Sequence, residues 1–134
     1  MRNKKHMTGE GEFLYDYKHD ILTFRTKGRE YKNSIEFQNF VVDIDKENFV
    51  TGMRVFDASK VFNMDRYSLR NITEGEFRAK VEDKVITITL NFASRIRNRI
   101  IPILGHKQNF TQQITTPLGR HHLADSLVEC SASS

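Results

Sequence analysis

Hydrophobic and polar residues alternate in short runs over the first half of the chain, and a polar segment of a few residues bounds each run. Residues 13–15 and 21–25 flank the turn-forming segment 16–20. Leu22 and Phe24 share one face of the second run by the two-residue period of a strand, and the residues between and after them point the other way. The pattern predicts a β-hairpin with one buried face.

A second hairpin is predicted over residues 35–56. Alternation over residues 35–44 changes phase at residues 38–39, which predicts a bulge or bend within that run. The turn-forming segment 45–48 follows, and residues 50–56 alternate again. The chain is therefore expected to return beside the preceding run.

The hydrophobic period changes to three and four residues near residues 57–71, which predicts one short helical segment. Asp57 and Asp65 can each accept hydrogen bonds from the free amides of a first helical turn. Gly75 is expected to end this segment, because glycine commonly follows the last helical residue.

The clearest strand pattern lies in residues 77–82 and 85–92, which predict a third hairpin around a polar turn. Residues 100–104 include a proline and predict an edge strand, because proline has no amide hydrogen for a central ladder. Residues 110–114 predict a last strand. The alternation fades from residue 117 onward, which is typical of a mobile end.

These elements predict an α+β fold, a mainly antiparallel sheet of about six or seven strands built from hairpins, with one short helical segment. Residues 13–116 are expected to form a single β-rich domain, and residues 1–12 and 117–134 to form flexible ends. One short helix cannot cover a sheet of that size. Either the sheet curls on itself or two copies pack face to face, and we expect a homodimer.

Composition narrows the function classes. The 21 Lys and Arg residues against 17 Asp and Glu residues give a net charge of +4, too weak a bias to identify a nucleic-acid-binding protein. Cys130 is the single cysteine, which favours a reducing compartment. His121 and His122 could join Cys130 at a metal ion, but adjacent histidines point apart in regular structure. No apolar run approaches the roughly 20 residues of a membrane span, so a cytoplasmic protein is expected.

Residues 15–24 form an aromatic, Asp-containing hairpin, and residues 42–59 form a strand, turn and strand block that ends in Asp-Ala-Ser. These stretches resemble the domain-of-unknown-function 2283 family of archaea and bacteria, and over residues 13–92 the chain looks like its longer archaeal variants. The resemblance implies a small strand-rich fold with no established activity, and an antitoxin-like role as an alternative. Thr51 and Arg54 depart from the usual Val and Glu, and Arg54 reverses a charge on the outer face.

Asp43, Asp45, Glu47 and Asn48 resemble the start of a calcium-binding loop. Arg54 stands where a bidentate acid is needed, however, and the central glycine of such a loop is missing. The four residues are instead typical of a hairpin turn. We therefore expect no metal site here.

Asp16, His19 and Asp20 place an imidazole between two carboxylates, a grouping that can transfer protons in a pocket. The neighbouring sequence supplies no nucleophile, oxyanion hole or Gly-rich phosphate loop. The ordinary interpretation is a hairpin turn, so we expect neither catalysis nor a cofactor.

Arg95, Arg97 and Arg99 would lie on one face of an extended chain, with Lys107 close across the next turn. Such a row suits phosphate contacts, although charged residues also protect an edge strand from aggregation. The leading hypothesis is a noncatalytic protein–protein interaction module. A nucleic-acid-binding or antitoxin-like protein and an enzyme using the Asp/His loop are the alternatives.

Overall fold

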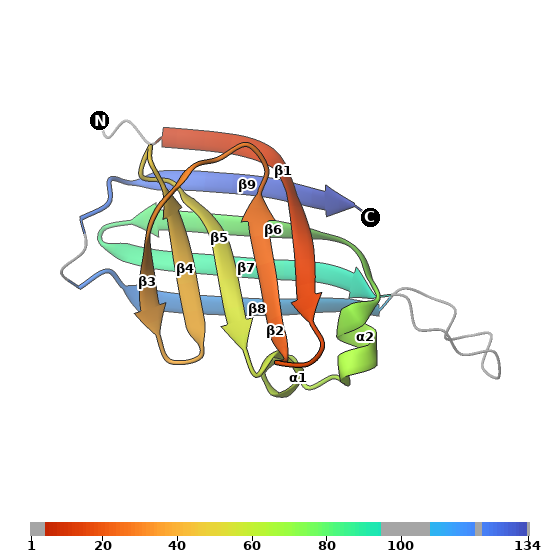
Figure 1. Cartoon of the computed structure of the whole chain (residues 1–134). Coiled ribbons are helices and arrows are strands. Elements are labelled where there is room, and N and C mark those ends of the chain that lie inside the picture. Colours follow the sequence, from red (N-terminus) through yellow and green to blue (C-terminus); the bar gives the residue numbers. More distant parts are fainter. Residues whose placement is uncertain (1–4, 95–107, 120–121, 134) are drawn as a thin grey trace.

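The computed structural model describes residues 5–94, 108–119 and 122–133, and these fold into nine strands and two short helices (Figure 1). The strands are β1 (Lys5–Asp16), β2 (Ile21–Thr26), β3 (Tyr31–Phe37), β4 (Phe40–Asp45), β5 (Val50–Phe56), β6 (Ile72–Glu82), β7 (Val85–Ser94), β8 (Gln108–Pro117) and β9 (Ser126–Ser133). The helices are α1 (Ala58–Val61) and α2 (Arg66–Arg70). The β-rich α+β class is therefore confirmed.

The strands follow the order β3-β4-β5-β2-β1-β9-β6-β7-β8, and β1 belongs to both halves of this sheet. Its residues 11–16 pair with β2 in antiparallel fashion, whereas its residues 5–10 run parallel to β9. We call β3, β4, β5, β2 and the second half of β1 the front sheet, and the first half of β1 with β9, β6, β7 and β8 the back sheet. Figure 1 shows the strands of the two sheets crossing each other.

The hydrophobic core lies between the two sheets. Phe24 of the front sheet stacks on Phe77 of the back sheet with ring centroids 4.6 Å apart, and Phe13 lies 5.2 Å from Phe24 and 5.9 Å from Phe92. Phe62, which follows α1, packs edge-on against Phe92. The sheet thus curls over and covers its own apolar face. This is one of the two arrangements that the sequence predicted. A second copy is not needed for that cover.

The three predicted hairpins are present as β1–β2, β4–β5 and β6–β7. The phase shift at residues 38–39 is a turn rather than a bulge, because Gln38 adopts a positive φ of 51° and the chain reverses there. The expected single run is therefore two strands, β3 and β4, which form a fourth hairpin. A bulge does occur in β3, between Tyr31 and Asn33.

The helical segment is split into helices of four and five residues, and neither is long enough to cross a bilayer. Asp65 caps α2 as expected, because its side chain accepts a hydrogen bond from the Ser68 amide at 2.7 Å. Asp57 adopts a left-handed conformation and its side chain caps nothing. Gly75 lies within β6 and does not end a helix.

Two expectations for the chain ends differ from the structure. Residues 126–133 form β9 between β1 and β6 instead of a flexible tail, and β1 begins at Lys5 within the expected flexible segment 1–12. The parallel pairing of β1 with β9 makes the sheet mixed rather than wholly antiparallel. Residues 110–114 lie in β8 as predicted, and residues 100–104 lie outside the described residues.

Candidate functional site

Asp16, His19 and Asp20 lie in the β1–β2 hairpin, where His19 pairs with Asp16 and the Asp20 side chain is engaged elsewhere. Asp16 is exposed and accepts hydrogen bonds from the backbone amide of His19 at 3.0 Å and from its Nδ1 at 2.8 Å. Asp20 turns into the protein and is only 3% exposed. The Asp16 carboxylate thus lies on the surface of the turn, whereas the Asp20 carboxylate is buried.

The Asp20 carboxylate joins the hairpin to the start of α1. It accepts hydrogen bonds from the Tyr15 hydroxyl at 2.6 Å, the Ser59 hydroxyl at 2.6 Å and the Ser59 amide at 3.0 Å. The Asp20 carbonyl also accepts the Ala58 amide at 3.0 Å. Asp20 therefore supplies the capping interaction that sequence analysis had assigned to Asp57.

These contacts shift the pKa values of both acids. Burial alone would raise the pKa of Asp20, but the hydrogen bonds from Ser59 and Tyr15 outweigh it, so the pKa lies below its usual value. Burial, together with the hydrogen bond to Asp20, raises the pKa of the Tyr15 phenol far above its usual value. At neutral pH this is a carboxylate held by two neutral hydroxyl donors.

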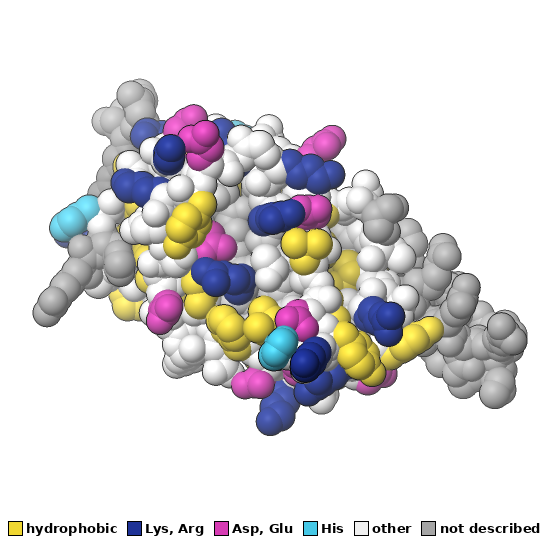
Figure 2. All heavy atoms as spheres, viewed as in Figure 1, with side chains coloured by type: hydrophobic (Ala, Val, Ile, Leu, Met, Phe, Trp, Pro, Cys, Tyr) yellow, Lys and Arg dark blue, Asp and Glu magenta, His cyan; other side chains and the backbone are white. Residues whose placement is uncertain are grey.

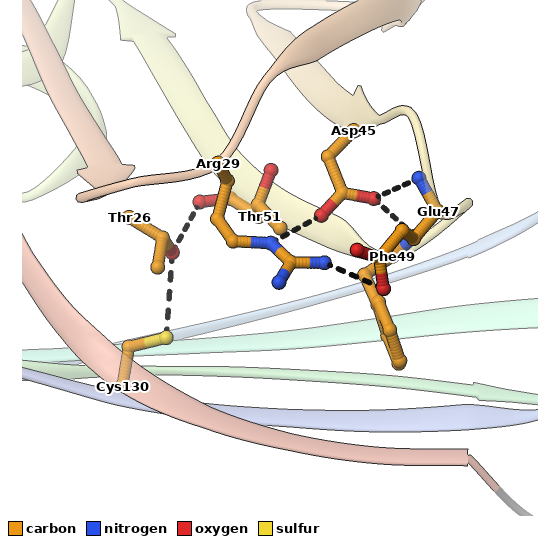
Figure 3. Close-up of polar contacts among 7 residues, drawn as sticks. All are labelled: Thr26, Arg29, Asp45, Glu47, Phe49, Thr51 and Cys130. Carbon is orange, nitrogen blue, oxygen red and sulfur yellow. Dashed lines mark hydrogen bonds and ion pairs between the residues drawn. The ribbon is translucent and has the colours of Figure 1, made fainter.

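The Asp43 to Asn48 segment is a hairpin turn, with its oxygens already engaged by cations and amides. Asp45 is 1% exposed and accepts hydrogen bonds from the amides of Glu47 and Phe49, each at 2.9 Å, and from Arg29 Nε at 2.6 Å (Figure 3). Asp43 accepts a hydrogen bond from Arg54 Nη2 at 2.9 Å. Across the residues that the structure describes, no three metal-ligating side chains come together.

The pairing of Asp43 with Arg54 also accounts for the unusual charge noted at Arg54. Asp43 and Arg54 lie on neighbouring strands of the front sheet, both on its outer face. The arginine therefore meets its counter-ion within the same sheet.

Arg29 fills the space between the β4–β5 turn and the core. Its guanidinium lies 5.5 Å from the centroid of the Phe49 ring, and its Nη2 lies 3.3 Å from a Glu47 carboxylate oxygen (Figure 3). The hydrogen bond to Asp45 raises the pKa of Arg29 further. The Arg29 guanidinium therefore pairs with two of the acidic residues of this turn, Asp45 and Glu47.

Cys130 of β9 faces the front sheet and is 4% exposed. Its sulfur lies 3.3 Å from the Thr26 hydroxyl, which donates a hydrogen bond to the Thr51 carbonyl at 2.7 Å (Figure 3). Burial raises the pKa of the Cys130 thiol. His122 is exposed whereas Cys130 is buried, and His121 lies outside the described residues.

We expect Cys130 to be protected from disulfide reagents in the folded protein, because the thiol is buried and its pKa is raised. The labelling rate should rise with urea concentration in parallel with unfolding. Stopped-flow or plate-reader labelling across a urea series measures this. Rapid labelling in native buffer, at a rate that urea does not change, would contradict it.

Exposed aromatic residues gather at the end of the front sheet that carries the β1–β2 turn and α2. We define the aromatic end as Leu14, Tyr17, Tyr67 and Arg70. The first three are 43%, 49% and 47% exposed. Figure 2 shows hydrophobic and basic side chains side by side on the lower part of this face.

Two arginines of α2 connect the two segments of the aromatic end. The Arg70 guanidinium lies 5.4 Å from the centroid of the Tyr17 ring, and Arg66 Nη1 donates to the carbonyl oxygens of Tyr17 at 3.1 Å and Lys18 at 3.4 Å. The turn and α2 are thereby tied together, although residues 17–18 and 66–70 are far apart in sequence. No local sequence pattern links the two segments, so this surface is not predictable from the sequence alone.

A pocket of about 190 Å³ opens where β1, β6 and β9 meet. Glu12, Phe13, Lys27 and Ile72 contribute to its walls. Its volume is below the range of roughly 300–1,000 Å³ that is usual for small-molecule sites, whereas two hollows of about 340 Å³ and 310 Å³ along β6 and β9 reach that range. The arginine row at Arg95, Arg97 and Arg99 and its companion Lys107 lie outside the described residues.

Comparisons with known proteins give one family match and two archaeal relatives, each over part of the chain. Residues 13–59 match the model of the family described as "Protein of unknown function (DUF2283)". A Methanosarcina mazei protein named "Putative hypoxanthine phosphoribosyltransferase" is 29% identical over 90 residues, which cover 67% of this chain and 73% of that protein. An uncharacterized Methanocaldococcus jannaschii protein is 31% identical over 77 residues, 57% of this chain and 66% of that protein. No solved structure matches.

The matched segment, residues 13–59, corresponds to a continuous part of the fold. It begins in the second half of β1, runs through β2, β3, β4 and β5, and ends in α1. It contains both Asp20 and Ser59, whose side chains hydrogen-bond to each other. The segment that matches the DUF2283 model therefore folds as most of the front sheet together with the start of α1.

Proposed function

We propose that the chain is a noncatalytic protein-binding module and that it binds its partner through the aromatic end. The observation that carries this proposal is the exposure of Tyr17 and Tyr67 beside Arg70 on one fixed surface. Tyrosine and arginine are the residue types that dominate binding energy at protein interfaces. A surface that is already ordered loses little conformational entropy on binding.

The residues with catalytic potential support the same proposal. Asp20, Asp45 and Cys130 are each buried and engaged in contacts that hold the two sheets or their turns. The name of the Methanosarcina relative raises phosphoribosyl transfer as an alternative. Nucleotide-binding enzymes commonly bind phosphate with a Gly-rich loop and the N-terminus of the helix that follows it. The helices described here have only four and five residues, which does not favour that alternative.

The test is co-purification from the native host with tagged wild-type protein and the double variant Tyr17→Ser/Tyr67→Ser. Truncation of an aromatic hot-spot residue costs a complex at least roughly 2 kcal/mol of binding free energy. The dissociation constant of the double variant should therefore rise at least about thirtyfold, and the amount of recovered partner should fall accordingly. Tyr31→Ser is the matched control, because Tyr31 is 61% exposed but lies on β3, at the other edge of the front sheet. Equal recovery by the wild type and the double variant would refute the proposed surface.

Binding of single-stranded nucleic acid is a second candidate, favoured by Lys18, Arg66 and Arg70 around the two tyrosine rings. Bases stack on aromatic rings while basic groups contact the backbone, and such binding weakens steeply with salt. Fluorescence anisotropy with labelled DNA and RNA oligonucleotides measures it. Salt-sensitive binding that the double variant loses would favour this candidate over a protein partner.

A further inference from the structure

Strand β3 is the outermost strand of the front sheet. Among the strands that the structure describes, only β4 pairs with it. An unpaired strand edge presents backbone donors and acceptors to any other strand of suitable sequence. The outer edge of β3 is therefore a surface that can add one more strand.

The hairpin register fixes which backbone groups face outward. Phe37 lies opposite Phe40 across a two-residue turn, and the residues that flank such a turn exchange both backbone hydrogen bonds. The alternation then directs the amide and carbonyl groups of Ser34 and Glu36 away from β4. These residues offer the free edge its hydrogen-bonding groups.

We propose that two copies of the chain pair through β3 in antiparallel fashion, with the two-fold axis at Ser34. Ser34 then lies opposite Ser34 of the partner subunit, and Lys32 lies opposite Glu36 of the partner subunit. By symmetry the same ion pair forms twice, as an isologous interface requires. The inference uses a different surface from the aromatic end and does not depend on the proposed function.

The charges select this register over its neighbour. An axis at Ile35 also keeps the outward groups in phase, but it sets Lys32 against Gln38 and leaves Glu36 against Ser34. Opposite charges directly across a strand pair are attractive, and like charges are repulsive. Of these two registers, only the axis at Ser34 places both Lys32 and Glu36 opposite a residue of opposite charge.

Both charged side chains are available for the pairing. Glu36 is exposed and no cation of the described chain pairs with it. Lys32 is exposed at the bulge of β3, and its Nζ donates to the Asn48 side chain at 2.8 Å on the surface. That exposed contact is weak enough to be exchanged for a carboxylate.

The experiment is sedimentation equilibrium on the full chain, its charge-reversal variants Lys32→Glu and Glu36→Lys, and an equimolar mixture of the two. Each variant alone sets like charges opposite each other twice, so its dimer dissociation constant should rise on the order of tenfold or more. In the mixed dimer both positions regain opposite charges, so the mixture should dimerise as tightly as the wild type. Added salt should weaken the wild-type dimer, because exposed ion pairs are screened.

Lys18→Glu is the matched control for Lys32→Glu, because it makes the same change of net charge on the β1–β2 turn and should leave the dissociation constant unchanged. Recovery of dimers in the mixture also shows that both variants are folded. A wild-type chain that stays monomeric to its solubility limit would overturn the inference. So would a dimer that neither reversal weakens, or a mixture that binds no better than the separate variants.

Discussion

Gly11→Ala is expected to destabilise the protein by about 3 kcal/mol or more, because the core at this point has no room for a methyl group. A Cβ at Gly11 would lie 2.6 Å from Phe24 Cε2 and 2.7 Å from the Arg25 carbonyl oxygen. Phe24 is fully buried and stacked on Phe77, so its ring cannot move aside. Gly11 is the residue at which β1 passes from β9 to β2.

Urea unfolding with calorimetry measures this loss, and a fall in Tm on the order of 10 °C is expected. Gly28→Ala is the matched control. Gly28 has a φ of 76°, but no atom lies within 4 Å of a Cβ built there, so only backbone strain of roughly 1 kcal/mol is introduced. If the two variants lose the same free energy of unfolding, the close contact of Gly11 with Phe24 is not the cause of the loss in Gly11→Ala.

Asp20→Ala is expected to destabilise the protein by about 3 kcal/mol, because it leaves the Tyr15 hydroxyl and both Ser59 donors without their acceptor. Asp20→Asn retains one acceptor oxygen and tolerates the positive φ of 57° at this position, so its loss should be smaller. Urea unfolding compares the two. Asp16→Asn removes the exposed carboxylate of the same hairpin and should change stability far less.

The same cluster gives a pH dependence with a definite sign. The pKa of Asp20 is lower in the folded protein, so its contribution is present at neutral pH and is lost as pH falls below about 4. The pKa of Tyr15 is raised, so its contribution is complete below about pH 10 and is lost as pH rises further. Tyr15→Phe should remove the alkaline loss and keep the acid one. An unchanged alkaline profile in that variant would contradict the assignment to Tyr15.

The sequence predicted those strands in which large apolar residues alternate with polar ones, because that alternation is what a half-buried strand requires. β9 was missed although it follows the same period. Its inward residues include Ser126, Cys130 and Ala132, which are too small to give a hydrophobic signal. Small side chains fit there because Gly9 of β1 lies beside Cys130.

The candidate site was only partly predictable for a related reason. The turn-forming character of Asp45 and Asp20 was recognised, but their partners come from other elements. Arg29 lies 16 positions before Asp45, and Ser59 lies 39 positions after Asp20. The family resemblance rested on an aromatic hairpin and an Asp-Ala-Ser block, and the structure shows that these two blocks touch. The presence of both motifs in one family was therefore the sequence feature that could have predicted the contact between Asp20 and Ser59.

The arrangement of β1 and β9 also sets an order on folding during synthesis. The front sheet is built from three hairpins and the pairing of β2 with β5, all within residues 11–56, whereas β9 inserts between β1 and β6 and pairs Lys5 with Ser126. Contacts between neighbouring segments form early, and contacts across long loops form late. A growing chain can therefore form the hairpins of the front sheet on the ribosome while their apolar face is still uncovered, and the back sheet is completed only once β9 has been synthesised and can pair with β1 and β6.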